Sequence, residues 1–321
     1  MDSDFEPTVP WISNPDIVKA FLKPFAELIG RFSGPEYTCV DTQVETIFLK
    51  TNVNSPHQVI FLSDIHGGTR SHSDKESLKN IFGLVKDCAE NSPTPTNQIF
   101  LIGGDIVNKP FAPYDYGSSL TVLPSLLDGI SECVGQGINV VAVEGNHDIE
   151  NPDWHGFYKP RLQEAGLKIL TPFETSGFGE TIIIGLPDIT QPEYQNWHRN
   201  YLPFMRTLVP ADSKQLIYLF HNPDSIPYIL KYCTQDIPSL LLSGHSHLTG
   251  YDRNNGRLGK ALGNLALRGI PIHNQQYVNP RLFLNEGRFL SINSPGVGIH
   301  PFHLTRRNRP MIHNIHLSAS V

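Results

Sequence analysis

Six short apolar segments recur along the chain, and their pattern constrains the fold more than any other feature of the sequence. The segments are QVIFLSD, QIFLIGGD, INVVAVEGN, ETIIIGLPD, LIYLFHN and SLLLSGH. Their length and their content of aliphatic residues are typical of strands buried on both faces of a sheet. Helical periodicity in residues 75–90 and 120–134 separates the first three segments, and strand patterns return in GRFLSIN and RPMIHNIHL. This order predicts an α/β protein in which helices pack on a mixed sheet.

Length and charge limit the class of protein. The 321 residues, of which 39% are hydrophobic, are enough for one large domain with a sizeable core. The net charge of -6 argues against a nucleic-acid partner, because nucleic-acid-binding domains usually carry a basic face. Four scattered cysteines without a CxxC pair predict reduced thiols in a reducing compartment. The first residues lack the layout of a secretory signal, and no segment reaches the roughly 20 apolar residues of a membrane span. We therefore expect a cytoplasmic protein.

Residues 1–40 predict an amphipathic helical extension. Asn14 and Pro15 are typical of an N-cap followed by proline at the first helical position. Apolar residues then recur at helical spacing as far as Phe32, although Pro24 interrupts the pattern. Two interpretations stay open. The helix packs on its own domain or on a partner subunit, or residues 14–32 contact a membrane surface, which would make the protein peripheral on the inner membrane.

The remaining residues, 41–321, are expected to form one catalytic domain. Within it, the segment 251–285 is rich in Gly, Asn and Arg and has no clear periodicity. Long loops of this kind often carry function, and this one follows a strand that ends in two histidines. We expect it to be a lid-like insertion.

Polar residues with metal-binding side chains follow five of the six apolar segments. These residues are Asp64, His66, Asp105, Asn146, His147, Asp148, His221, His245 and His247. Ligands of open α/β sheets bind outside the carboxyl ends of the strands, where loops from different strands converge. Taken singly, an Asp could cap a helix, an Asn could adopt a left-handed turn and a His could be structural. One shared site explains all five strand ends together, and carboxylates, imidazoles and an amide suit divalent transition metals.

The number of donors predicts two metal ions. Apart from His147, the set contains two aspartates, one asparagine and four histidines, which is too many for one ion with an open position. Two-metal sites hold their ions about 3.5–4 Å apart and clamp the attacking and leaving oxygens of a displacement. A water between two cations ionises near neutral pH. This chemistry fits the hydrolysis of a phosphate ester or anhydride.

The motifs DIH, GGDIVN, GNHD, the histidine of LFHNPD, and GHSH occur in this order from Val59 to His247. As a set they resemble the calcineurin-like metallophosphoesterase superfamily. HNPD and the late segment SPGVGIHPFHLTRRNRPMIHNIHL are also similar to the YkuE/YaeI branch of bacterial phosphoesterases. The chain departs from that branch at Leu248 and Thr249, where a glycine pair is usual, and at Asn108, where an acid is usual.

The resemblance implies an α/β (α+β) architecture, namely the four-layer αββα sandwich of the metallo-dependent phosphatase fold, with two mixed β-sheets. It implies one ion held by Asp64, His66 and His247. It implies a second ion held by Asn146, His221 and His245. Asp105 would bridge the ions, His147 would act on the leaving oxygen of the substrate, and Asp148 would orient His147.

The sequence leaves the substrate and the metal open. Candidate substrate contacts are Asn108, Arg70, Arg268, His273, Arg281 and His303. The ligand set accepts Mn, Fe or Zn, and we expect Mn first. Relatives of the branch include a pyrophosphatase that cleaves UDP-2,3-diacylglucosamine in lipid A synthesis, and the N-terminal helix and the lid favour such a nucleotide-linked lipid. The alternatives are another small phosphoester or a non-catalytic metal-binding scaffold. The sequence does not predict the oligomeric state.

Overall fold

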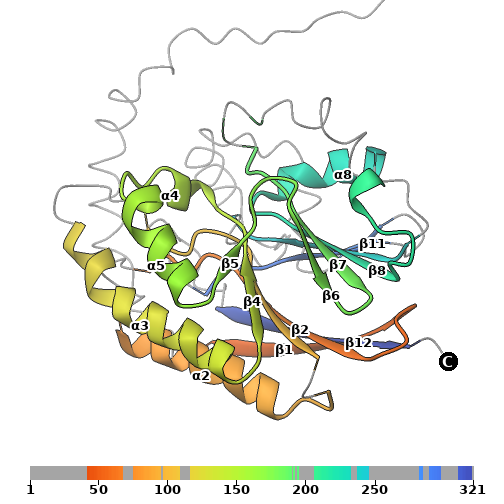
Figure 1. The fold of residues 1–321 in the computed structure, drawn as a ribbon, viewed down its shortest axis with the longest axis horizontal. Coiled ribbons are helices and arrows are strands. Elements are labelled where there is room, and N and C mark those ends of the chain that lie inside the picture. The colour runs from red at the N-terminus through yellow and green to blue at the C-terminus, as the bar shows by residue number, and fades with distance from the viewer. Residues whose placement is uncertain are drawn as a thin grey trace, which may run out of the picture.

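The computed structural model describes residues 42–67, 75–94, 97–108, 116–189, 191, 194, 206–232, 237–245, 282–284, 289–297 and 310–319. The expected N-terminal extension lies outside these residues, as does nearly all of the lid-like insertion. Within the described residues, two six-stranded sheets face each other and helices cover their outer faces (Figure 1).

The first sheet is mixed. Its strands are, in order, β1 (Gln43–Thr51), β12 (Met311–Ala319), β2 (His57–Leu62), β3 (Gln98–Ile102), β4 (Asn139–Ala142) and β5 (Lys168–Ile169). Neighbouring strands run parallel except β12 and β2, which are antiparallel. The parallel run from β2 to β5 places the carboxyl ends of these strands at one edge of the sheet.

The second sheet is also mixed. Its strands are, in order, β10 (Leu282–Leu284), β11 (Phe289–Asn293), β9 (Ser239–Ser243), β8 (Gln215–Leu219), β7 (Thr181–Gly185) and β6 (Thr175–Phe178). The four central strands are parallel, and the strand at each edge is antiparallel to its neighbour. All six apolar segments of the sequence are therefore strands, three in each sheet.

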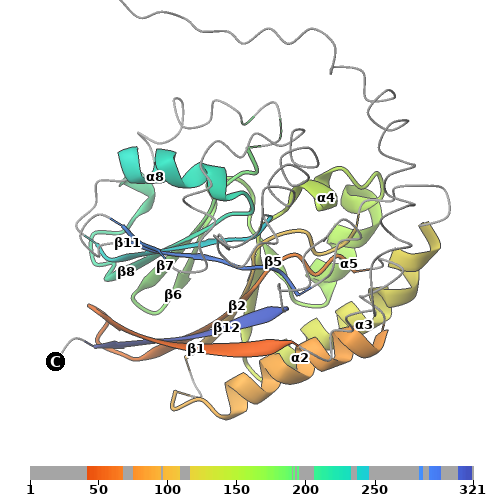
Figure 2. The same ribbon diagram turned by 180° about the vertical axis from the view of Figure 1, so that it is seen from behind.

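Helices cover the outer face of each sheet. Among the described residues, the α-helices are α2 (Lys75–Glu90), α3 (Tyr116–Gly135), α4 (Asn146–Ile149), α5 (Lys159–Glu164) and α8 (Ile226–Tyr232). The described part of the chain also contains a π-helix, η2 (Trp154–Tyr158), and two 3₁₀ turns, η4 (Arg206–Leu208) and η5 (Pro223–Ser225). Figure 2 shows α2 and α3 along the outer side of the first sheet, with α8 on the far side of the second. No described helix is long and apolar enough to cross a membrane.

Three layers of buried side chains hold these elements together. One lies between the first sheet and its helices and includes Ile81 and Phe100. The second fills the space between the sheets, where Phe61 and Leu242 are both fully buried. The third lies between the second sheet and α8 and includes Tyr218. Each strand of the central runs is apolar on both faces because each face borders a core. The α/β fold with two mixed sheets is thereby confirmed, in the arrangement αββα.

Two of the four cysteines are described, and both are structural. Cys88 of α2 and Cys133 of α3 are buried free thiols in the core under the helices. Burial raises the pKa of each thiol to about 11, so both stay protonated and unreactive at neutral pH.

Candidate metal centre

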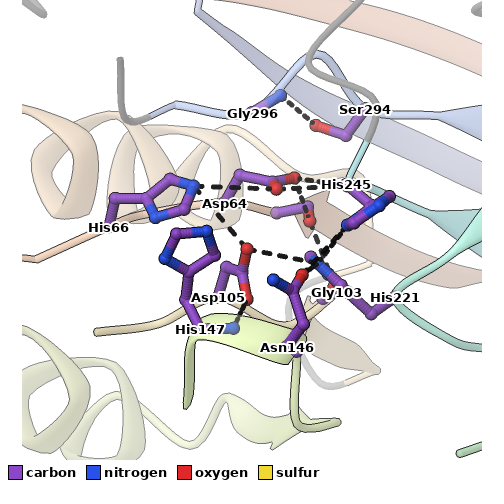
Figure 3. A network of polar contacts seen from close by, with 12 residues as sticks. Asp64, His66, Gly103, Asp105, Asn146, His147, His221, His245, Ser294 and Gly296 are labelled. Carbon is purple, nitrogen blue, oxygen red and sulfur yellow. Dashed lines mark hydrogen bonds and ion pairs between the residues drawn. The ribbon is translucent and has the colours of Figure 1, made fainter. Parts of the chain in front are cut away.

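Side chains from both sheets converge at the edge where the parallel strands end (Figure 3). The first sheet contributes Asp64 and His66 after β2 and Asp105 after β3. In the second sheet, His221 follows β8 and His245 follows β9. Asn146, His147 and Asp148 come from α4, the single helical turn after β4. The structure thus brings together eight of the nine residues that the sequence placed at strand ends; the ninth, His247, lies outside the described residues.

The backbone turns sharply at four of these residues. Asp64, His66, Asp105 and His245 have φ angles of 53°, 47°, 52° and 65°. Side chains other than glycine rarely adopt this left-handed region, and each such residue costs on the order of 1–3 kcal/mol. Among the described residues, Phe173 is the fifth non-glycine residue with a positive φ. Backbone strain is therefore concentrated at the strand ends, where it directs the side chains into one space.

Hydrogen bonds across the loops fix the strained segments. The Asp64 amide donates to the Gly104 carbonyl at 3.0 Å, and the His66 amide donates to the Asp105 carbonyl at 2.9 Å. The Ser63 hydroxyl donates to Asp64 Oδ2 at 2.5 Å. From the other sheet, the His245 amide donates to both carboxylate oxygens of Asp64 at 3.1 Å. The two sheets are consequently joined at the site through Asp64.

The ligand-type atoms form two groups that share Asp105. His221 Nε2 lies 3.2 Å from Asp105 Oδ2 and 3.1 Å from Asn146 Oδ1. His245 Nδ1 lies 3.0 Å from the same Asn146 oxygen and 3.2 Å from His221 Nε2. On the other side, His66 Nε2 lies 3.7 Å from Asp105 Oδ2 and 3.9 Å from Asp64 Oδ1. In each of two clusters, Asp64–Asp105–His221 and His66–Asp105–His147, ligand atoms lie within 4.8 Å of one another.

The orientation of the His221 ring suits a metal ligand. Its Nδ1 lies 2.8 Å from the Gly103 carbonyl oxygen. Because a carbonyl oxygen only accepts hydrogen bonds, Nδ1 carries the proton in this contact. With Nδ1 committed to Gly103, Nε2 is the nitrogen that faces Asp105 and Asn146, and a metal ion would take the place of its proton. The donor set and its orientation fit a divalent transition metal.

The electrostatics of the centre favour a cation. Burial, together with neighbouring Asp105, raises the pKa of Asp64 to about 7. Burial is strong at Asp105 too, but His221 and His147 hold the pKa of this carboxyl well below its usual range. Although burial opposes it, Asp105 raises the pKa of His221 well above its ordinary value. Burial and the neighbouring His221 lower the pKa of His245 to about 4. A divalent cation would stabilise the ionised carboxylates and the neutral imidazoles together.

His147 and Asp148 lie at the border of the centre. The His147 amide donates to Asp105 Oδ1 at 2.8 Å, and its ring meets the His66 ring edge-on at 4.8 Å between centroids. The fully buried Asp148 accepts from the Val107 amide at 2.9 Å and the Gly145 amide at 3.0 Å. Burial and Asp105 raise the pKa of Asp148 to about 8. These contacts fasten α4 to the loops after β3 and β4, and the orientation of His147 by Asp148 stays a prediction.

The predicted substrate contacts are mostly outside the described residues. Asn108 is described and is buried. Its backbone amide donates to the Gly67 carbonyl at 3.3 Å, and its backbone carbonyl accepts from the Asn151 side chain. It follows the β3 loop that carries Asp105. The others, Arg70, Arg268, His273, Arg281 and His303, lie outside the described residues and stay predictions.

One carboxylate near the centre was not singled out from the sequence. Asp188 follows β7 and is buried, with 1% of its surface exposed. The Leu186 amide donates to the Leu219 carbonyl at 2.9 Å, which keeps the end of β7 beside the end of β8. Burial lowers the pKa of both His221 and His245, and the Asp188 charge acts against it: after Asp105 it contributes to the raised pKa of His221, and it offsets part of the lowering at His245. The segment ETIIIGLPD does end in an acid, but this acid comes three residues after the strand.

Comparison with known proteins agrees with this geometry. Residues 57–248 match the model of the protein family described as calcineurin-like phosphoesterase. The match covers more than half of the chain and runs from β2 to the residues just after β9, so it includes all the candidate ligands. A search of curated proteins finds no match.

Proposed function

The chain belongs to the calcineurin-like phosphoesterase family, a family of metal-dependent phosphoester hydrolases, and we propose that it hydrolyses phosphodiester or pyrophosphate bonds with two divalent metal ions. The observation that carries this proposal is the position of Asp105. Its carboxylate lies between His221 on one side and His66 on the other, and it belongs to both clusters of ligand-type atoms.

The ligand sets follow from the two groups. One ion would be held by Asp64 and His66, with His247 added from the sequence. The other would be held by Asn146, His221 and His245. Asp105 would contact both ions. Two such ions, when bound, polarise the phosphoryl group and lower the pKa of water. We expect Mn, with Fe or Zn as alternatives.

The protein's own groups would position the substrate and move a proton. His147 is held by its amide on Asp105 and by its ring against His66. From this place it would donate a proton or a hydrogen bond to the leaving oxygen of the ester. The backbone hydrogen bonds of Asp148 keep α4, and therefore His147 and Asn146, in register with Asp105. Pre-positioned groups of this kind account for much of the rate in phosphoryl transfer.

A direct assay tests the reaction class. Mn-loaded protein should release p-nitrophenolate from bis(p-nitrophenyl) phosphate. The Asp105→Asn variant should lose at least about a hundredfold in rate, because changing even a residue that only orients a ligand costs 10–100-fold. Asp87→Asn on the exposed face of α2 makes the same chemical change and should leave the rate unaltered. Full metal content without hydrolysis would favour the non-catalytic scaffold.

Within this class, the sequence suggests one specific substrate. This substrate is UDP-2,3-diacylglucosamine, which the protein would hydrolyse at the cytoplasmic side of the inner membrane. Two sequence patterns support it: the amphipathic pattern of residues 14–32 and the mixture of apolar and basic residues in 251–285. Mn-loaded protein should then release UMP from this lipid nucleotide. Turnover of aryl phosphodiesters without release of UMP would exclude this lipid nucleotide as the substrate and would leave the proposed reaction class unaffected.

A further inference from the structure

Ser63 is a polar residue at the candidate metal centre that the proposed ligand sets do not use. It follows β2, directly precedes Asp64 and is fully buried. Its hydroxyl oxygen lies 2.5 Å from Asp64 Oδ2 and 3.0 Å from the carbonyl oxygen of Gly103, which follows β3. The hydroxyl has one proton for these two acceptors, and an ionised carboxylate accepts the stronger hydrogen bond. Ser63 therefore acts first on Asp64.

The hydrogen bond from Ser63 distinguishes the two carboxylate oxygens of Asp64. Oδ2 accepts from the Ser63 hydroxyl, whereas Oδ1 lies 3.9 Å from His66 Nε2. The His245 amide donates to both oxygens at 3.1 Å, so this contact treats them equally. The Ser63 hydroxyl thus occupies the oxygen on the side of β2 and leaves Oδ1 on the side of His66.

Two glycines close the space around the hydroxyl. A Cβ atom at Gly244 would overlap Ser63 Oγ and Asp64 Oδ2, and a Cβ atom at Gly103 would lie 3.1 Å from Ser63 Oγ. The backbone of Ser63 is held as well, because its carbonyl accepts from the Val297 amide at 3.1 Å. The hydroxyl consequently has a fixed place from which it can orient the Asp64 carboxylate.

The Gly103 carbonyl oxygen also contacts the other group of ligands. It accepts from His221 Nδ1 at 2.8 Å (Figure 3). A carbonyl oxygen has two lone pairs and can accept two hydrogen bonds, so the bond from His221 does not need the Ser63 hydroxyl. Removal of this hydroxyl would leave the orientation of His221 in place and would release Asp64 alone.

We infer that Ser63 is a positioning residue of the metal centre: its hydroxyl holds Asp64 Oδ2 and thereby directs Oδ1 to the ion that we place at Asp64 and His66. The inference rests on the proposed two-metal function and deepens it, because it assigns a residue that supports one of the two ions and not the other. Partners that orient a metal ligand contribute about 10–100-fold to metal affinity.

Stepwise binding of Mn²⁺ tests the inference. Ser63→Ala removes one oxygen and adds no atom, so it introduces no clash into this closed space. Titration calorimetry should show that one Mn²⁺ ion binds about 10–100-fold more weakly, while the affinity of the other stays within about threefold of that in the unaltered protein. Crystals of the variant at a Mn²⁺ concentration between the two dissociation constants should lack the anomalous peak at Asp64 and His66 and keep the peak at His221.

Ser239→Ala is the matched control. Ser239 is also buried, at the start of β9, and its hydroxyl donates to the Ile237 carbonyl at 3.0 Å. Its substitution removes the same atom from a hydrogen bond at the other end of the strand that precedes His245. Both Mn²⁺ affinities of this variant should equal those of the unaltered protein.

The difference between the two affinities separates positioning from a structural role. If Ser63 only stabilised the fold, Ser63→Ala would lower the melting temperature in EDTA without separating the two ions. Unchanged affinities, or equal losses for both ions, would overturn the inference. Selective loss of one ion, with no hydrolysis by the unaltered Mn-loaded protein, would refute the phosphoesterase function alone. Hydrolysis by the unaltered protein without selective loss in the variant would refute the role of Ser63 alone.

Discussion

Gly145, the residue before Asn146, gives the sharpest test of how the candidate centre is assembled. A Cβ atom at this position would lie 2.2 Å from Asp105 Oδ1 and 2.4 Å from the Asp105 amide nitrogen. Real Cβ contacts essentially never fall below 3.0 Å, so Gly145→Ala must separate α4 from the Asp105 carboxylate by at least about 0.8 Å, the difference between 3.0 and 2.2 Å. Asp105 cannot yield easily, because its Oδ1 accepts from the His147 amide and its Oδ2 lies beside His221.

The size of the effect follows from this displacement. A shift of about 1 Å in groups that position a reaction costs roughly a hundredfold in rate, and overpacking a filled site costs about 1–3 kcal/mol in stability. We therefore expect Gly145→Ala to lower kcat/KM for bis(p-nitrophenyl) phosphate about a hundredfold and to lower the melting temperature. Gly156→Ala, a few residues along in the π-helix η2, is the matched control, because a Cβ there meets nothing within 4 Å. If Gly145→Ala retains its rate within twofold, the reasoning about the packing of α4 against Asp105 is wrong.

Three further outcomes are expected. In protein treated with EDTA, the melting temperature should fall between about pH 6.5 and 8. Burial raises the folded-state pKa of Asp64 to about 7 and of Asp148 to about 8, so the folded state binds more protons than the unfolded state, and its stability declines as the pH rises through these values. A rising melting temperature would contradict this. Mn²⁺ should raise the melting temperature and bind more tightly at pH 8 than at pH 6, because it displaces the proton of Asp64, and calorimetry in buffers of different ionisation enthalpy should detect the release of this proton. Trp154→Phe should lower the free energy of unfolding by about 1–3 kcal/mol in urea, because it removes the part-buried hydrogen bond from the buried indole to Glu144. Lys86→Met breaks the exposed pair with Glu132 and should change the free energy of unfolding by less than about 1 kcal/mol. Equal effects would show that burial does not decide the difference.

Local patterns in the sequence were enough to predict the strands that matter for the site. Each of the six apolar segments is a strand, and the predicted helix over residues 75–90 is α2 with the same bounds. These segments are recognisable because both of their faces are buried, so that no polar residue interrupts them. β1 was not predicted, because it lies at a sheet edge and only two of its nine residues, Ile47 and Thr51, are buried. Pairing of β1 and β2 with β12 joins residues more than 250 positions apart, which periodicity does not report.

The candidate site was predictable in its members and not in its geometry. Asp, His and Asn at strand ends are visible in the sequence, and the parallel order brings them together. The left-handed backbone of Asp64 and His245 is not visible, because no glycine marks these positions. The tautomer of His221 depends on a carbonyl contributed by Gly103 of the other sheet. Asp188 was not predicted as part of the site, because its place near His221 depends on the pairing of β7 with β8.

The central claim is that Asp105 lies between two metal ions. Crystals grown with Mn²⁺ should show two anomalous difference peaks about 3.5–4 Å apart, with the Asp105 carboxylate in contact with both. One peak should lie on the side of Asp64 and His66, and the other on the side of Asn146, His221 and His245. A single peak at full Mn²⁺ saturation, or two peaks of which only one contacts Asp105, would contradict the account.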